Sequence, residues 1–134
     1  MYSVWWLMKI RTVQELLDLI AQCRRSTGIE VTLLASSANV SPKFISQLEN
    51  GKETIEVDSL IKVARALGMD IPVLFDPIST GIQVKAKRLE LELDQITGAA
   101  LCNVSPRFLS TIENGKPNKR LNKLFDVLKG FGID

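Results

Sequence analysis

A 14-residue stretch occurs twice in this chain, and it constrains the fold more than any other feature. Residues 39–52 read NVSPKFISQLENGK and residues 103–116 read NVSPRFLSTIENGK, so that 10 of the 14 positions are identical. Three of the four differences keep the chemical type, as in Lys43 and Arg107. So close a match at an offset of 64 residues indicates an internal repeat. We therefore predict two domains of the same fold.

Each copy carries the signals that begin and end a short helix. In the first copy, Ser41 can cap the helix with its hydroxyl, and Pro42 suits the first helical position, where its missing N–H does no harm. Gly51 suits the left-handed residue that commonly follows the last turn. Only Ile45 and Leu48 form a clear apolar pair between these signals. The remaining surface is polar and basic, and it is either a solvated face or a surface offered to a partner.

Length and composition describe a globular protein made of two small domains. The chain has 134 residues, of which 46% are hydrophobic and 24% are charged. Domains of about 60 residues bury limited surface, so mutual packing or dimerisation would help them. The apolar run from Val4 to Met8 is much shorter than the roughly 20 residues that span a bilayer. We therefore expect no membrane partner.

The residue types that most catalytic and metal sites use are nearly missing from the sequence. There is no histidine, and the two cysteines, Cys23 and Cys102, stand alone and are interpreted as buried structural thiols. No zinc site, Cys–His pair or serine triad can be assembled from these residues. No glycine-rich phosphate loop is present. We predict a protein that is not an enzyme and that uses no metal and no cofactor.

Charge is distributed unequally between the two repeats. Residues 1–80 carry 8 basic and 9 acidic side chains, whereas residues 81–134 carry 9 basic and 6 acidic ones. Four basic residues cluster just after the second copy, namely Lys116, Lys119, Arg120 and Lys123. The matching positions of the first repeat hold Lys52, Ile55, Glu56 and Ser59. Attraction to the phosphates of a nucleic acid should therefore be stronger in the second repeat.

Apolar residues at helical spacing predict four helices in each repeat. In the first repeat we expect them at about 13–25, 31–37, 42–50 and 58–67. In the second repeat we expect them at about 83–91, 95–101, 106–114 and 121–131. Residues 77–81, which contain a proline and a glycine, have the composition of a linker. The predicted organisation is an N-terminal extension (1–11), a first domain (12–76), this linker and a second domain (82–134).

The segment Met69–Phe75 lies after the last helix of the first repeat and is predicted to be a strand. It is too short and too interrupted for a helix, and Pro72 would restrict it to a sheet edge or a bulge. A lone strand in a helical domain needs a partner strand. The alternative is an extended linker held against the core.

The second repeat resembles the helix-turn-helix of the Cro and lambda-repressor type. Residues 93–117 read LDQITGAALCNVSPRFLSTIENGKP, with Gln95 opening the second helix, Ala99 four residues later, a turn, and Glu-Asn-Gly-Lys at the end of the recognition helix. The first repeat fits the same pattern except that Val31 stands at the glutamine position. The resemblance implies an all-α fold of two tandem lambda-repressor-like helix-turn-helix domains, with a short strand after the first.

The resemblance also implies a function, that of a sequence-specific transcriptional repressor acting on double-stranded operator DNA at the nucleoid, in the cytoplasm. In this family the recognition helix lies in the major groove. The positions implied for base contact are Ser41, Pro42, Lys43, Ser46 and Gln47 in the first repeat, and Ser105, Pro106, Arg107, Ser110 and Thr111 in the second. The positions implied for contact with the DNA backbone are Asn50, Lys52, Gln95, Asn114 and Lys116, to which Lys119 and Arg120 of the basic cluster are added.

Glu49 and Glu113 fall on the recognition helices, where an acidic side chain would repel DNA. The resemblance implies that each glutamate pairs with an arginine of the first helix of its own domain. Those arginines are Arg24 and Arg88, each 25 residues before its glutamate. We therefore predict two buried ion pairs with a structural role.

The segment Met69–Phe75 makes the first repeat similar to the HipB-type antitoxins, in which a strand pairs across a dimer. This similarity implies an antitoxin role beside a HipA-like kinase toxin, and a homodimer with these segments paired antiparallel. Recognition helices of like kind would then lie about 34 Å, or a multiple of it, apart. Two alternatives stay open: a phage-like or restriction-modification control regulator, and a protein-interaction module in which one or both repeats bind a protein. Val31 and the acidic first half favour the second alternative for the first repeat.

Overall fold

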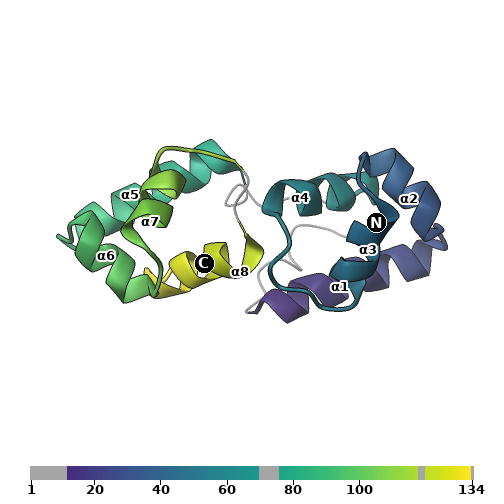
Figure 1. Cartoon of the computed structure of the whole chain (residues 1–134), viewed down its shortest axis with the longest axis horizontal. Coiled ribbons are helices and arrows are strands. Elements are labelled where there is room, and N and C mark those ends of the chain that lie inside the picture. Colours follow the sequence, from purple (N-terminus) through teal and green to yellow (C-terminus); the bar gives the residue numbers. More distant parts are fainter. Residues whose placement is uncertain (1–11, 70–75, 118–119, 134) are drawn as a thin grey trace. The chain divides into compact units, whose positions relative to one another are not determined.

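The computed structural model describes residues 12–69, 76–117 and 120–133 (Figure 1). The chain divides into two compact units, Met1–Ile71 and Pro72–Asp134, called unit 1 and unit 2. Unit 1 contains α1 (Val13–Thr27), α2 (Val31–Ala38), α3 (Pro42–Glu49) and α4 (Val57–Ala66). Unit 2 contains α5 (Pro77–Glu90), α6 (Gln95–Cys102), α7 (Pro106–Glu113) and α8 (Leu121–Gly130). The predicted all-α class is confirmed. The predicted strand lies outside the described residues except for Met69, which is buried.

The first helix shows how local sequence sets the bounds of an element. The hydroxyl of Thr12 accepts a hydrogen bond from the backbone N–H of Glu15 at 3.1 Å and so caps the N-terminus of α1. Gly28 ends the helix in the left-handed conformation, with φ at 73°. Between these two residues, apolar side chains at helical spacing, such as Leu16 and Ile20, face the core.

Helices pack in the same order within each unit. In unit 1, α1 packs against α3, and α2 packs against α3 and α4. In unit 2, α5 packs against α7, and α6 packs against α7 and α8. The third helix of each unit is therefore held between the first and second helices, and its two buried side chains enter the core: Ile45 and Leu48 in α3, and Leu109 and Ile112 in α7.

The prediction of a linker over residues 77–81 is wrong, because these residues form the first turns of α5. The carboxylate of Asp76 accepts a hydrogen bond from the N–H of Ser79 at 3.0 Å, and Pro77 occupies the first turn. Gly81 is buried because α5 passes close to the end of α7. A Cβ at this position would lie 2.5 Å from the carbonyl oxygen of Ile112. The proline and the glycine therefore serve a helix start and a helix–helix contact.

The two units fill one part of their cores with different residues. In unit 2, Gly98 lies beneath the buried ring of Phe131, and a Cβ at Gly98 would come 3.2 Å from that ring. The equivalent positions of unit 1, 64 residues earlier, hold Leu34, which is buried, and Leu67, which is half-buried. The two units therefore fill this part of the core differently: Gly98 leaves room for the larger ring of Phe131, whereas unit 1 has a leucine at both positions.

Gly81→Ala is predicted to destabilise unit 2 by about 1–3 kcal/mol, because the new methyl group would overlap a backbone carbonyl that cannot move away. The sign is informative, since the same change inside an unconstrained helix stabilises by about 1 kcal/mol. Urea unfolding followed by circular dichroism measures the difference. Gln83→Ala, at an exposed position of the same helix, is the control and should change little. A Gly81→Ala protein as stable as the wild type would refute the close contact.

Candidate nucleic-acid interface

A sharp turn leads into α3 and α7, the two predicted recognition helices. Asn39 and Asn103 lie in the turn with left-handed φ values of 56° and 58°, a conformation that asparagine tolerates better than most residues. In unit 1, the N–H of Val40 donates to the carbonyl of Ala35 at 3.0 Å and closes the end of α2. The same bond recurs in unit 2. Each unit therefore has the helix–turn–helix geometry that the sequence predicts.

The serine that precedes each recognition helix is a helix cap. The hydroxyl oxygen of Ser41 accepts from the N–H of Phe44 at 3.1 Å, and that of Ser105 accepts from the N–H of Phe108 at 3.0 Å. These hydroxyls keep their own O–H groups as donors. A base or phosphate contact by either serine would therefore be added to its capping bond.

Within each unit, most of the predicted DNA-contacting residues are exposed, on the recognition helix or in the segment after it. The exposed ones are Ser41, Pro42, Lys43, Ser46, Asn50 and Lys52 in unit 1, and Ser105, Pro106, Arg107, Asn114, Lys116 and Arg120 in unit 2. Gln47, Gln95, Ser110 and Thr111 are half-buried. Lys119 lies outside the described residues.

Two polar side chains, one within α7 and one directly after it, bond to groups of that helix. The hydroxyl of Thr111 donates to the carbonyl of Arg107 at 2.9 Å, and the amide of Asn114 donates to the hydroxyl of Ser110 at 3.4 Å. The O–H of Thr111 is thereby committed to the backbone. What this residue can still offer a base is a methyl group and an acceptor oxygen, whereas Gln47 at the equivalent position of α3 carries a full amide.

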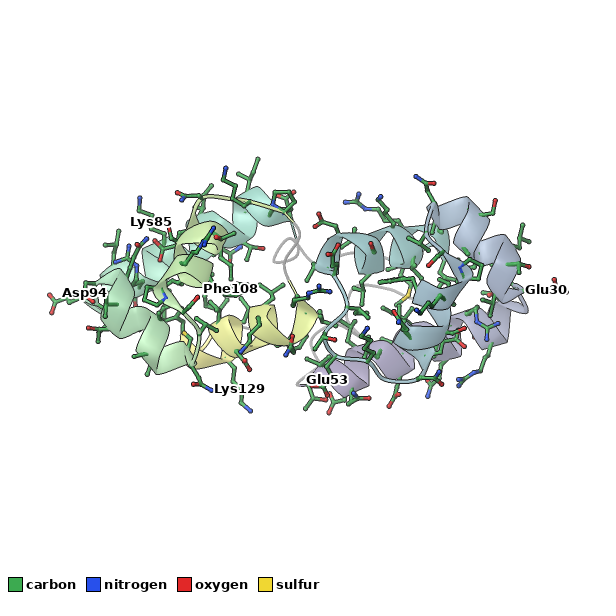
Figure 2. The ribbon with its side chains drawn as sticks, in the orientation of Figure 1. Glu30, Glu53, Lys85, Asp94, Phe108 and Lys129 are labelled. Carbon is green, nitrogen blue, oxygen red and sulfur yellow. The ribbon has the colours of Figure 1, made fainter. Side chains whose placement is uncertain are left out.

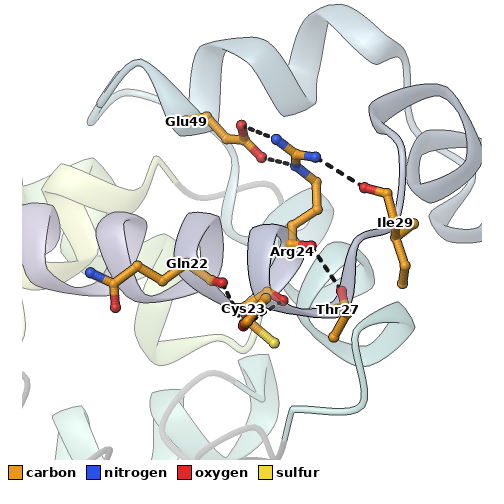
Figure 3. A network of polar contacts seen from close by, with 7 residues as sticks. Gln22, Cys23, Arg24, Thr27, Ile29 and Glu49 are labelled. Carbon is orange, nitrogen blue, oxygen red and sulfur yellow. Dashed lines mark hydrogen bonds and ion pairs between the residues drawn. The ribbon is translucent and has the colours of Figure 1, made fainter.

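An arginine–glutamate pair ties α3 into unit 1 (Figure 3). Both Nε and Nη2 of Arg24, near the end of α1, donate to the carboxylate of Glu49, the last residue of α3. The Nη2 bond measures 2.8 Å. The third group, Nη1, donates to the carbonyl of Ile29 at 2.9 Å, just before α2 begins. One guanidinium therefore joins three segments of the unit.

Unit 2 repeats this network with deeper burial. Nε and Nη2 of Arg88 donate to Glu113 at 2.7 and 2.9 Å, and Nη1 donates to the carbonyl of Leu93 at 2.7 Å. The two side chains of this pair are 9% and 3% exposed, against 17% and 14% for the pair in unit 1. The amide of Gln95 also donates to Glu113, at 3.2 Å. Gln95 was predicted to contact a phosphate. The structure shows that it also has a partner within its own unit, Glu113, which was not predicted.

These contacts shift the pKa values of the paired groups. Hydrogen bonding to Glu113 raises the pKa of Arg88, which keeps its charge. Burial acts to raise the pKa of Glu113, but hydrogen bonds from Arg88 and Gln95 outweigh it, so that the pKa lies below its ordinary value. A carboxylate with a lowered folded-state pKa stabilises the fold above its unfolded-state pKa. That contribution is lost as the pH falls through the folded-state value.

The start of α6 contains a residue whose role the sequence reading missed. The carboxylate of Asp94 accepts from the N–H of Thr97 at 2.7 Å, and this bond holds the pKa of Asp94 below its ordinary value. Glu30 stands at the equivalent place before α2 and makes no capping bond with its side chain. An aspartate directly before an apolar helical segment is a recognised start signal, so the sequence did carry this information.

Comparison with known protein families decides the family. The model of the helix-turn-helix family matches the chain twice, over residues 20–74 and 84–134. The chain belongs to the helix-turn-helix family. The resemblance to the lambda-repressor type and the tandem repeat are both confirmed by these two matches. Searches of curated proteins and of solved structures give no match.

Helix-turn-helix proteins of this kind are DNA-binding transcription regulators, and the protein has this kind of function. The family is typically not enzymatic. Among the residues that the structure describes, no helix has both the length and the apolar character needed to cross a membrane.

Glu113→Gln is predicted to destabilise unit 2 by about 3–5 kcal/mol, because it leaves the buried charge of Arg88 without its counter-charge. Glu49→Gln, the matched change in unit 1, should cost less, since that pair is more exposed to solvent. Urea unfolding at neutral pH ranks the two variants. Equal losses of unfolding free energy in the two variants would show that burial of the ion pair does not set the size of the loss. The difference in stability between the wild type and Glu113→Gln should begin to narrow below the ordinary pKa of a glutamate, about 4.3, and should vanish once the pH has fallen through the lower folded-state pKa of Glu113, where the wild type is protonated as well.

Proposed function

We propose that this protein is a sequence-specific transcriptional repressor that binds operator DNA through α3 and α7. The observation that carries the proposal is the repeated construction of one surface. In each unit a serine caps the start of a helix after a left-handed turn, and this helix buries only two side chains in the core and exposes polar and basic side chains. A helix of this kind fits the major groove with its N-terminal half against base edges.

The two helices are proposed to read different bases. Lys43 and Arg107 can both donate to guanine, and Arg107 can do so through two bonds. Gln47 can pair with adenine through its amide. The O–H of Thr111 donates to the backbone of α7. The methyl group of this residue remains available and suits the methyl group of thymine. Ser46 and Ser110 can bond to more than one base, and Pro42 and Pro106 can offer only apolar contact.

Contacts with the DNA backbone are proposed at the end of each recognition helix. Asn50, Lys52, Asn114 and Lys116 would set the register of the protein on the duplex without reading sequence. The amide nitrogen of Gln95 carries two hydrogens, and the bond to Glu113 uses one of them. The other could donate to a phosphate, and Val31 offers no such group. Gln95, Lys119 and Arg120 therefore favour a stronger attraction of DNA to unit 2 than to unit 1.

A narrower proposal concerns the partners. We propose that the repressor is a homodimer whose Met69–Phe75 segments pair antiparallel, as in HipB-type antitoxins, and that a HipA-like kinase toxin is its protein partner. Similarity of the first repeat to those antitoxins supports this. A kinase-like gene beside the gene of this protein would support it further. A phage or restriction-modification neighbourhood would favour a control regulator instead.

The second candidate function is a protein-interaction module, with unit 1 binding a protein rather than DNA. Val31 in place of glutamine and the net negative charge of residues 1–80 favour it. Full-length protein should be used to decide between the two, because a fragment starting at residue 80 would lack Asp76, which caps α5, and its first turn.

Binding of the full chain to DNA fragments selected from a random pool is predicted to weaken steeply as salt rises, since phosphate contacts release counterions. Lys43→Ala together with Gln47→Ala tests unit 1, and Arg107→Ala together with Ser110→Ala tests unit 2. If both units read DNA, both double variants lose affinity. If unit 1 binds a protein, only the second does. Absence of any selected, salt-sensitive DNA binding would overturn the repressor proposal.

Arg107→Ala is predicted to relax the base preference at one operator position, at a cost of about 1–3 kcal/mol in binding free energy. Lys116→Ala should weaken cognate and scrambled duplexes alike and reduce the salt slope by about one. Fluorescence anisotropy with both duplexes over a salt series measures the two effects. Identical effects of the two variants on the two duplexes would contradict this division between base reading and backbone contact.

A further inference from the structure

The outer side of α5 carries a row of exposed apolar side chains that unit 1 lacks. Ile78, Ile82 and Leu89 are 67%, 65% and 56% exposed. The equivalent positions of unit 1, 64 residues earlier, hold Gln14, Asp18 and Arg25. The same scaffold therefore exists with polar residues at all three places. Ile78 also lies close to Gly115 of its own unit, as Gln14 does to Gly51. Folding does not require apolar residues at the other two places, and the presence of Ile82 and Leu89 there needs another explanation.

The three side chains lie in one line along the helix, and Lys85 continues that line between Ile82 and Leu89. An α-helix turns by about 100° per residue, so these four positions fall within about 60° of one another. Lys85, labelled in Figure 2, is exposed as well. The buried residues of α5, such as Val84, lie on another side of the helix, towards the core. We call these four residues, Ile78, Ile82, Lys85 and Leu89, the α5 stripe.

The spacing within the α5 stripe is four, three and four residues, which is the a/d spacing of a coiled-coil seam. A single charged residue in such a seam specifies the register of the helices. In an antiparallel pair of α5 helices, Ile78 of one copy faces Leu89 of the other, and Ile82 faces the aliphatic stem of Lys85. A parallel pair would instead bring the two ammonium groups together. Charge therefore favours the antiparallel arrangement.

We propose that the α5 stripe is a contact between two copies of this chain, formed by antiparallel packing of their α5 helices about a two-fold axis. The stripe is complementary to itself in this register, as an interface on a two-fold axis must be. It differs from the pairing proposed for Met69–Phe75, and its formation does not require DNA.

The area of the stripe indicates how strong this contact is. Full burial of one isoleucine or leucine side chain corresponds to on the order of 100 Å². Three such side chains and a lysine stem from each copy give roughly 700 Å², which is less than the about 1,000 Å² of a stable interface. The α5 contact is therefore weak in free solution, whether or not the pairing proposed for Met69–Phe75 also forms. A duplex that holds two copies side by side would raise their effective concentration and make their binding cooperative.

Sedimentation equilibrium of the full chain tests the proposal. The α5 contact should make the wild type self-associate weakly, at high micromolar concentration, as expected of an interface smaller than a stable one. Ile78→Gln, Ile82→Asp and Leu89→Arg together give unit 2 the residues that unit 1 carries on the same scaffold. This triple variant should associate about tenfold or more weakly, because charged groups would lose water at the seam. Circular dichroism checks that it folds.

Two further variants sharpen the result. Leu33 is 60% exposed on unit 1, and Leu33→Thr gives it the residue that unit 2 has at the equivalent position, Thr97. This control should leave association unchanged. Lys85→Leu removes the only charge from the seam and should strengthen association by about threefold or more. This gain tests the α5 contact even if the triple variant fails to fold.

Three outcomes would overturn the α5 contact. The first is a wild type that stays monomeric at high micromolar concentration. The second is a folded triple variant that associates as strongly as the wild type, which would leave Met69–Phe75 as the interface. The third is a Lys85→Leu variant with unchanged association. None of these outcomes bears on DNA binding, which is measured separately.

Discussion

The bond between an arginine and a glutamate is the contact on which each recognition surface depends. In unit 1, Arg24 joins the end of α1, the carbonyl of Ile29 and the last residue of α3. The glutamate stands at the C-terminus of its helix, where the backbone dipole disfavours a negative charge. The arginine supplies the opposite charge and orients the helix at once. Because α3 is only eight residues long and buries two side chains, it has little else to fix its position.

The two units share the polar contacts that position the recognition helix and differ in the side chains that they expose. The same arginine–glutamate network, serine caps and left-handed asparagine turns occur in both. Buried networks of this kind are costly to break, since every member must keep its partner. Surface positions carry no such restriction, and there the residues of the two units differ. Unit 2 carries basic residues after α7 and an apolar row on α5 that unit 1 lacks, which suits the separate roles proposed for it in contacting DNA and a second protein copy.

The recognition element could be predicted from the sequence because its determinants are local. A serine followed by proline starts the helix, glycine follows its end, and Ile45 and Leu48 mark the buried side. The partners Arg24 and Glu49 are 25 residues apart, and the family resemblance supplied them. The linker prediction for residues 77–81 was wrong because a proline and a glycine are compatible with two structures. They occur in linkers, and they also occur in a helix that begins with the proline and approaches another helix at the glycine. That contact with Ile112 is invisible in the sequence.

The sequence by itself determined that there are two helix-turn-helix units and which side chains each recognition helix offers, because helix caps, spacing and the repeat are properties of short segments. Only the tertiary structure decided that Gln95 bonds to Glu113, that Gly81 of α5 approaches the end of α7, and that Ile78, Ile82 and Leu89 face outward. These features arise from how helices pack. The apolar pattern of α5 alone does not show which of its two apolar sides faces the core, because that depends on where the neighbouring helices pack against it.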